Sequence, residues 1–126
     1  EIYCAPANNP FWMSPGNSNP TGSVRVDPFW WKHNPVVFQN RDQARKKFNE
    51  KYWKVLLPIK GGRYHWGKYL PYADESFGGV TWGPALLAER YPMFTKWLEQ
   101  RKENDPDQMF VTPYWRKHFG LGEPPK

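Results

Sequence analysis

The sequence has few of the residues that stabilise or anchor a small secreted protein. Only one of its 126 residues, Cys4, is a cysteine, so no intrachain disulfide and no cysteine-based metal site can form. It also has no usable N-glycosylation signal, because Pro20 interrupts Asn19-Pro20-Thr21. Small secreted domains usually depend on disulfides. Both absences therefore argue against the secretory route.

Long hydrophobic runs are also missing. The longest are Val55-Leu56-Leu57 and Ala85-Leu86-Leu87-Ala88, whereas a helix that crosses a bilayer needs about 20 apolar residues. The sequence therefore predicts no transmembrane segment of its own.

Proline, glycine and tryptophan are plentiful instead. The chain has 14 prolines, 10 glycines and 8 tryptophans, and its hydrophobic fraction is only 39%. This composition predicts short elements with long connections, and aromatic rings that are buried against something other than one aliphatic core.

Positive charge is concentrated in the first half of the chain. The net charge is +6; residues 1–63 carry ten Lys/Arg and four Asp/Glu, whereas residues 64–126 carry eight of each. The first half therefore favours an acidic partner, which charge alone does not identify among RNA, anionic lipid headgroups and an acidic protein surface.

A short aromatic motif recurs three times. Asp27-Pro28-Phe29-Trp30-Trp31-Lys32-His33 has a near-copy in Thr112-Pro113-Tyr114-Trp115-Arg116-Lys117-His118, and Asn9-Pro10-Phe11-Trp12 is a shorter version. Proline stiffens the backbone that carries the two rings. The motifs are either internal clamps or anchors that dock on a partner. Under the second interpretation, the docking residues are Phe11, Trp12, Phe29, Trp30, Trp31, Trp53, Tyr114 and Trp115.

The pattern predicts a mainly α fold with a large irregular fraction. Helices are expected at about 41–57, 84–90 and 92–103, within an aromatic-rich helical domain spanning 27–119. An extended N-terminal arm, 1–26, precedes this domain, and a C-terminal tail, 120–126, follows it.

The helix at 41–57 is predicted to have two distinct faces. Its apolar stripe consists of Ala44, Phe48, Tyr52, Val55 and Leu56. Lys47, Lys51 and Lys54 form a basic stripe, which is either a solvated face or a contact surface for an acidic partner. Trp53 is expected to point away from the apolar face and to be exposed.

No residue pattern indicates catalysis. His33, His65 and His118 lack the spacing of metal ligands, Cys4 has no adjacent base, and Asp74-Glu75 are neighbours that point apart. The prediction is a protein that is not an enzyme, with no catalytic residues, no metal and no cofactor.

In overall character the chain resembles the supernumerary subunits of large mitochondrial assemblies, which are basic and rich in Trp and Pro. The resemblance implies a non-catalytic accessory subunit of an inner-membrane assembly, in a respiratory-chain complex or the ATP synthase. A mitochondrial ribosomal protein that binds rRNA is the alternative, and an aromatic-faced carbohydrate-binding module is a more distant one.

The same resemblance implies a location and partners. The expected location is the mitochondrion, peripheral to the inner membrane, with other protein subunits and anionic lipid headgroups as partners, and RNA under the ribosomal alternative. The first residue is Glu rather than Met, which is typical of a processed, imported protein, although a shortened chain would look the same.

Overall fold

The computed structural model describes residues 2–6, 11–16, 21–27, 41–68 and 70–125. Its elements, in chain order, are β1 Ile2–Ala5, β2 Ser23–Val26, α1 Arg41–Leu56, β3 Ser76–Phe77, β4 Val80–Thr81, α2 Pro84–Arg90, α3 Phe94–Asn104 and α4 Pro113–Phe119. The described part is mainly helical, as predicted. None of the helices within it is long and apolar enough to cross a membrane. The predicted division into arm, domain and tail stays a prediction.

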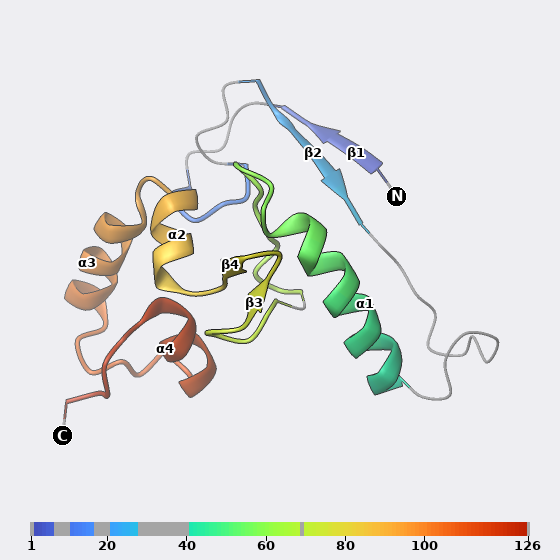
Figure 1. Cartoon of the computed structure of the whole chain (residues 1–126). Coiled ribbons are helices and arrows are strands. Elements are labelled where there is room, and N and C mark those ends of the chain that lie inside the picture. Colours follow the sequence, from blue (N-terminus) through green and yellow to red (C-terminus); the bar gives the residue numbers. More distant parts are fainter. Residues whose placement is uncertain (1, 7–10, 17–20, 28–40, 69, 126) are drawn as a thin grey trace.

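The helices form two groups around a small hairpin. Figure 1 shows α1 on one side and α2, α3 and α4 together on the other, with the antiparallel β3–β4 hairpin between them. α1 packs against β3, and α2 packs against both α3 and α4. The hairpin and the loops around it therefore connect the two groups.

The sequence did not reveal α4. This helix begins after Thr112, whose Oγ1 accepts a hydrogen bond from the Trp115 backbone N–H at 3.4 Å, and Pro113 occupies its first turn. It ends at Gly120, which adopts the left-handed conformation with φ 66°. Thr before Pro, and Gly after the last turn, are ordinary helix boundary signals. The prediction treated this segment as an aromatic motif and did not use them.

The predicted irregular arm contains a β-ribbon. β1 and β2 pair antiparallel, with Ile2 opposite Val26 and Cys4 opposite Val24. Residues directly opposite each other share a face of the ribbon, so these four form one apolar face, and all four are exposed. Sequence analysis missed the pairing because the two strands are separated by many turn-forming residues.

The core of the domain is largely aromatic. Trp82 is fully buried, and its ring meets Tyr64 edge-on at 5.3 Å; Tyr64 in turn meets Trp53 at 5.2 Å. The buried hydrophobic cluster consists of Trp53, Leu57, Tyr64, Leu70, Trp82, Leu86, Leu87, Tyr91 and Phe94. Trp53 and Trp82 are thus part of the core, in which aromatic side chains supply much of the buried area.

Two predictions for the faces of α1 are wrong. Trp53 is only 5% exposed, whereas Val55, assigned to the apolar stripe, is 66% exposed. Among the α1 side chains that the structure describes, Tyr52, Trp53 and Leu56 pack on the core, as does Leu57 just after the helix; those of Ala44 and Phe48 are outside the described set. This packed face is rotated from the predicted stripe because the aromatic cluster approaches the helix from the Trp53 side.

A single arginine joins the end of α1 to α2. The guanidinium of Arg90 donates to the carbonyl oxygens of Leu57 (2.8 Å), Ile59 and Gly62 (3.2 Å). These carbonyls lie at and just beyond the C-terminus of α1, where intrahelical donors are lacking and a cation is favoured by the helix dipole. Arg90 is 4% exposed, and its removal takes a buried donor from the Leu57 carbonyl, whereas the Ile59 carbonyl keeps its hydrogen bond from the Gly62 N–H at 3.0 Å.

We expect Arg90→Met to lower the free energy of unfolding by about 1–3 kcal/mol, the cost of leaving a buried acceptor without its hydrogen bond. Glu89→Gln is the matched control, because the Glu89 carboxylate is 64% exposed and lies 3.3 Å from Arg90 Nε; it should cost less than about 0.5 kcal/mol. Urea unfolding measures both. Equal effects of the two variants would contradict the role given to the buried hydrogen bonds.

Candidate functional site

Two exposed polar side chains are brought together by a tight turn. The Lys68 backbone N–H donates to the His65 carbonyl at 3.0 Å, which closes a four-residue turn with its end residues within about 7 Å. The side chains of His65 and Lys68 are both exposed. An imidazole and an ammonium group are therefore carried by the two end residues of one turn, and both are exposed.

Trp66, the second residue of this turn, fixes it to the domain. The indole Nε1–H donates to the Met13 carbonyl at 2.6 Å. The ring lies 5.4 Å from Tyr91 and 5.9 Å from both Trp115 and Phe119. These contacts come from three other parts of the chain, so the turn has a rigid base.

The imidazole of His65 is oriented by the turn itself. Its Nδ1 accepts a hydrogen bond from the Gly67 backbone N–H at 3.0 Å, which in the neutral ring leaves the proton on Nε2. A Cβ at Gly67 would lie 3.2 Å from His65 Cε1, closer than such contacts normally come. The missing side chain at Gly67 therefore leaves room for the imidazole, with Nε2–H available as a donor.

An aromatic groove adjoins the turn. It has a volume of about 500 Å³, and Trp66 is the residue of the turn that lines it; His65 and Lys68 are not among the lining residues. The other lining residues come from α3, α4 and the loop between them. The full lining consists of Trp66, Trp97, Arg101, Asn104, Asp105, Phe110, Val111, Trp115 and Phe119.

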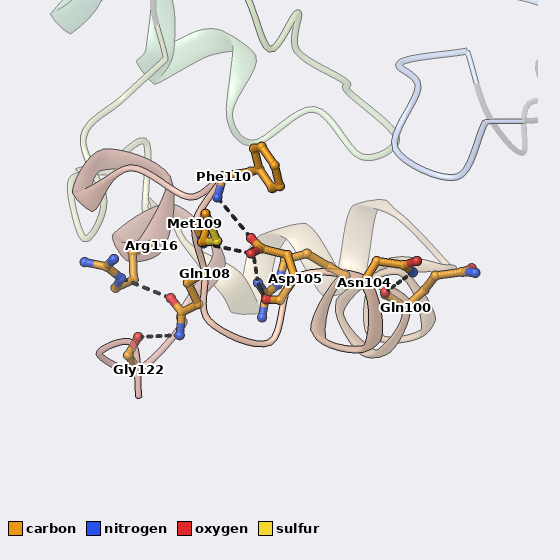
Figure 2. Close-up of polar contacts among 9 residues, drawn as sticks. Gln100, Asn104, Asp105, Gln108, Met109, Phe110, Arg116 and Gly122 are labelled. Atoms are coloured by element: carbon orange, nitrogen blue, oxygen red, sulfur yellow. Dashed lines mark hydrogen bonds and ion pairs between the residues drawn. The ribbon is translucent and has the colours of Figure 1, made fainter. Parts of the chain in front are cut away.

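A carboxylate shapes the rim of the groove. Asp105 Oδ1 accepts from the Met109 N–H at 2.7 Å, and Oδ2 accepts from the Phe110 N–H at 3.2 Å. Arg101 lies 3.8 Å from the same carboxylate. Figure 2 shows the Phe110 ring turned away from Asp105, and this ring is 86% exposed. The rim is thus a fixed loop with an exposed ring at the edge of the groove.

A glutamine anchors the same loop to the C-terminal segment. The Gln108 amide accepts from Arg116 Nε at 3.1 Å and donates to the Gly122 carbonyl at 3.1 Å. Gln108 itself adopts φ 54°, an uncommon value for a residue other than glycine. These bonds, seen in Figure 2, hold α4 and the loop together.

The two described histidines, His65 and His118, lie in different surroundings. The buried ring of His118 places Nδ1 2.9 Å from the Tyr114 carbonyl and Nε2 3.1 Å from the Pro71 carbonyl, so it joins α4 to the Pro71 loop. His33 lies outside the described residues. Within the part of the chain that the structure describes, no three side chains of the metal-binding types come together.

The predicted docking residues occupy different environments. Trp53 belongs to the core, Trp115 lines the groove, and Trp12 packs beneath the Lys96 ammonium, which lies 5.1 Å from the ring centroid. Phe11 is 73% exposed and Tyr114 is 40% exposed. Phe29, Trp30 and Trp31 lie outside the described residues. A docking role for the exposed rings stays a prediction.

The three basic contact residues are placed as expected. Lys47, Lys51 and Lys54 lie on α1 with exposed side chains. Whether they contact a partner stays a prediction, as do the mitochondrial location and the protein partners.

Comparison with known proteins places the chain in a family of enzymes. The family model described as D-arabinono-1,4-lactone oxidase matches residues 12–118, which include the turn and almost the whole groove lining. The chain belongs to the D-arabinono-1,4-lactone oxidase family. No solved structure is significantly similar to it.

This membership overturns the functional predictions made from the sequence. A non-catalytic accessory subunit of a respiratory-chain complex or the ATP synthase is wrong, and so are the ribosomal alternative and the conclusion that the protein is not an enzyme. The error came from reading abundant tryptophan as a sign of docking. In the structure, Trp53 and Trp82 are core residues, and Trp66 fixes the turn that presents His65 and Lys68.

Sequence analysis also missed this turn. The three histidines were tested there only for the spacing of metal ligands. The available signal was His65-Trp66-Gly67-Lys68 itself: glycine favours a turn, and a large ring within a turn of polar residues indicates an anchor.

We expect Gly67→Ala to displace the His65 imidazole without unfolding the domain, because the backbone at Gly67 is not in the left-handed region but the new Cβ would press on the ring. Changes in the His65 ring signals in two-dimensional NMR measure this. Gly122→Ala is the control, since a Cβ there would have nothing within 4 Å. Unchanged His65 signals in Gly67→Ala would contradict the proposed packing.

Burial raises the pKa of Tyr91 to about 12, above the value of about 10 in an unfolded chain. The stabilisation by neutral Tyr91 is thus complete below pH 10 and is lost as the pH rises towards 12, by about 3 kcal/mol in total. Between pH 10 and pH 12, the wild type should therefore lose stability relative to Tyr91→Phe. A difference in unfolding free energy between wild type and Tyr91→Phe that does not change with pH would contradict the prediction.

Proposed function

We propose that the complete protein oxidises a five-membered lactone of a sugar acid, with dioxygen as the electron acceptor. The observation that carries this is the family match over residues 12–118, whose description specifies D-arabinono-1,4-lactone and an oxidase. In the balanced reaction, the hydroxyl-bearing carbon beside the lactone carbonyl loses its hydrogen as a proton, the resulting enolate gives up two electrons, and the hydroxyl loses its proton. Dioxygen takes up the two electrons and two protons and becomes hydrogen peroxide.

Electron transfer to dioxygen normally depends on a redox cofactor, such as a flavin or a transition metal, which carries the electrons. The described residues do not form a recognisable site for such a group. The groove is lined mainly by rings, and its two charged side chains, Arg101 and Asp105, contact each other. We therefore assign to these residues only contacts with the lactone.

The edge of the groove offers complementary contacts to a sugar lactone. One face of the five-membered ring carries C–H groups, which pack well against indole and phenyl rings such as those of Trp66 and Trp115. The hydroxyl and carbonyl oxygens of the lactone need donors, and we assign this role to His65 Nε2–H and the Lys68 ammonium, which belong to the same turn as the groove residue Trp66.

Lys68 has a further role in this proposal. When the carbon beside the lactone carbonyl loses hydrogen, negative charge develops on the carbonyl oxygen. A cation held close to that oxygen stabilises the developing charge more than it stabilises the neutral substrate, and this difference lowers the barrier. The rigid base at Trp66 keeps the start of the Lys68 side chain in a fixed place.

We expect the complete protein to consume dioxygen and release hydrogen peroxide with D-arabinono-1,4-lactone, but not with the open-chain acid. Lys68→Met should lower kcat/KM by about 100-fold, the typical cost of removing one electrostatic contact to an oxyanion. Lys47→Met, on the exposed face of α1, is the matched control and should retain full activity. An oxygen electrode and a peroxide assay measure both.

The two parts of the proposal fail separately. No oxygen uptake with D-arabinono-1,4-lactone or any other 1,4-lactone of a sugar acid would overturn the oxidase assignment. Normal uptake in the wild type together with an unchanged kcat/KM in Lys68→Met would keep the activity and overturn the role of the turn.

A further inference from the structure

The basic stripe of α1 is joined by exposed apolar side chains. At 100° per residue, Lys47, Lys51 and Lys54 lie within about 60° of one another on the helix, and Val55 follows at the edge of the same face. All four side chains are exposed, Val55 by 66%. This part of α1 therefore combines three ammonium groups with an aliphatic side chain that has no place in the core.

The chain continues this surface beyond the helix. Pro58, Ile59 and Lys60 follow directly, and all three are exposed, Ile59 by 49%. We call Lys47, Lys51, Lys54, Val55, Ile59 and Lys60 the α1 patch. In the α1 patch, the aliphatic side chains of Val55 and Ile59 lie between Lys54 and Lys60 in the sequence.

The α1 patch is fixed rather than frayed. Arg90 binds the carbonyls of Leu57 and Ile59, and the Tyr64 hydroxyl donates to the Leu56 carbonyl at 3.0 Å. The end of a helix normally opens easily, because its last carbonyls lack partners. Here these carbonyls are bonded, so the exposed Val55 and Ile59 are held outward at little further cost in conformational entropy.

We propose that the α1 patch binds the surface of an anionic lipid bilayer. Lysines beside exposed aliphatic side chains on one helix face are typical of segments that lie in the headgroup region, where the cations meet lipid phosphates and the aliphatic groups reach the acyl boundary. The substrate of the proposed oxidase is uncharged, so it does not account for a cationic surface. The charge surplus in the first half of the chain is of the right sign for this partner.

The expected strength follows from the charges. Each lysine near an anionic membrane contributes an attraction that corresponds to about a fivefold change in partition coefficient. Removing two lysines should therefore weaken binding by about 30-fold. High salt should weaken it as well, because the Debye length shortens.

The test is co-sedimentation of the 126-residue chain with vesicles of phosphatidylcholine alone or with about a third phosphatidylserine. We expect binding only to the second kind. Lys51→Gln/Lys54→Gln should reduce it by about 30-fold. The matched control is Lys102→Gln/Lys117→Gln, which removes the same charge from exposed positions on α3 and α4 and should change binding by less than about threefold.

A third variant tests the apolar part. Val55→Gln introduces a residue that favours the helix and leaves the charge unchanged. It should weaken binding to the anionic vesicles several-fold. If the two double variants lost binding to the anionic vesicles equally, the attraction would depend on net charge alone. This result would overturn the assignment of binding to the α1 patch. Binding that is absent, or equal on both kinds of vesicle, would overturn it too. Tighter, lysine-dependent binding to single-stranded RNA at the same salt would assign the surface to nucleic acid instead.

Discussion

The contact between Arg90 and the end of α1 is the constraint on which the rest of the domain depends. One side chain from α2 satisfies carbonyls at Leu57, Ile59 and Gly62, in a region where the backbone turns sharply and has no regular element to pair with. A Cβ at Gly62 would lie 3.2 Å from the Arg90 guanidinium, so this position also has to be small. The loop that follows, with Tyr64 and Trp66, begins from this fixed point. The contacts of Arg90 therefore help to fix the orientation of this loop and of the candidate site that it carries.

Trp66 links the domain to its proposed chemistry. Its ring contacts Tyr91 at 5.4 Å, its N–H is bound to Met13, and the ring also lines the groove. A substrate-binding turn built on an aliphatic residue would lack both the directional hydrogen bond and the large contact area. The high tryptophan content is thus explained within the chain: small domains have little volume for a core, and rings supply buried area with few rotatable bonds.

The sequence predicted those features that depend on local chemistry. α1 and α2 lie within one residue of their expected bounds, because caps and prolines act locally. α3 begins at Phe94 rather than 92, since the Phe94 N–H first closes a turn with the Tyr91 carbonyl. The burial of Trp53 and the β1–β2 pairing depend on segments far apart in the sequence, and helical periodicity does not reveal which side of a helix a distant cluster will cover. The groove is built in the same way, from Trp66 and two later helices, so no single stretch of sequence predicted it.

The division of charge along the chain has a physical meaning once the family is known. Attraction at long range acts only on charged molecules, and D-arabinono-1,4-lactone is neutral, so the surplus of six positive charges in residues 1–63 does not help to capture it. Around the groove, by contrast, Arg101 is matched by Asp105 and Arg116 lies 3.6 Å from Glu123, which leaves a locally balanced surface suited to an uncharged ligand. The exposed lysines of α1 have no such matching ion pair among the described residues. These two surfaces with different electrostatics match the two proposals, a neutral small molecule at the groove and an anionic lipid surface at α1.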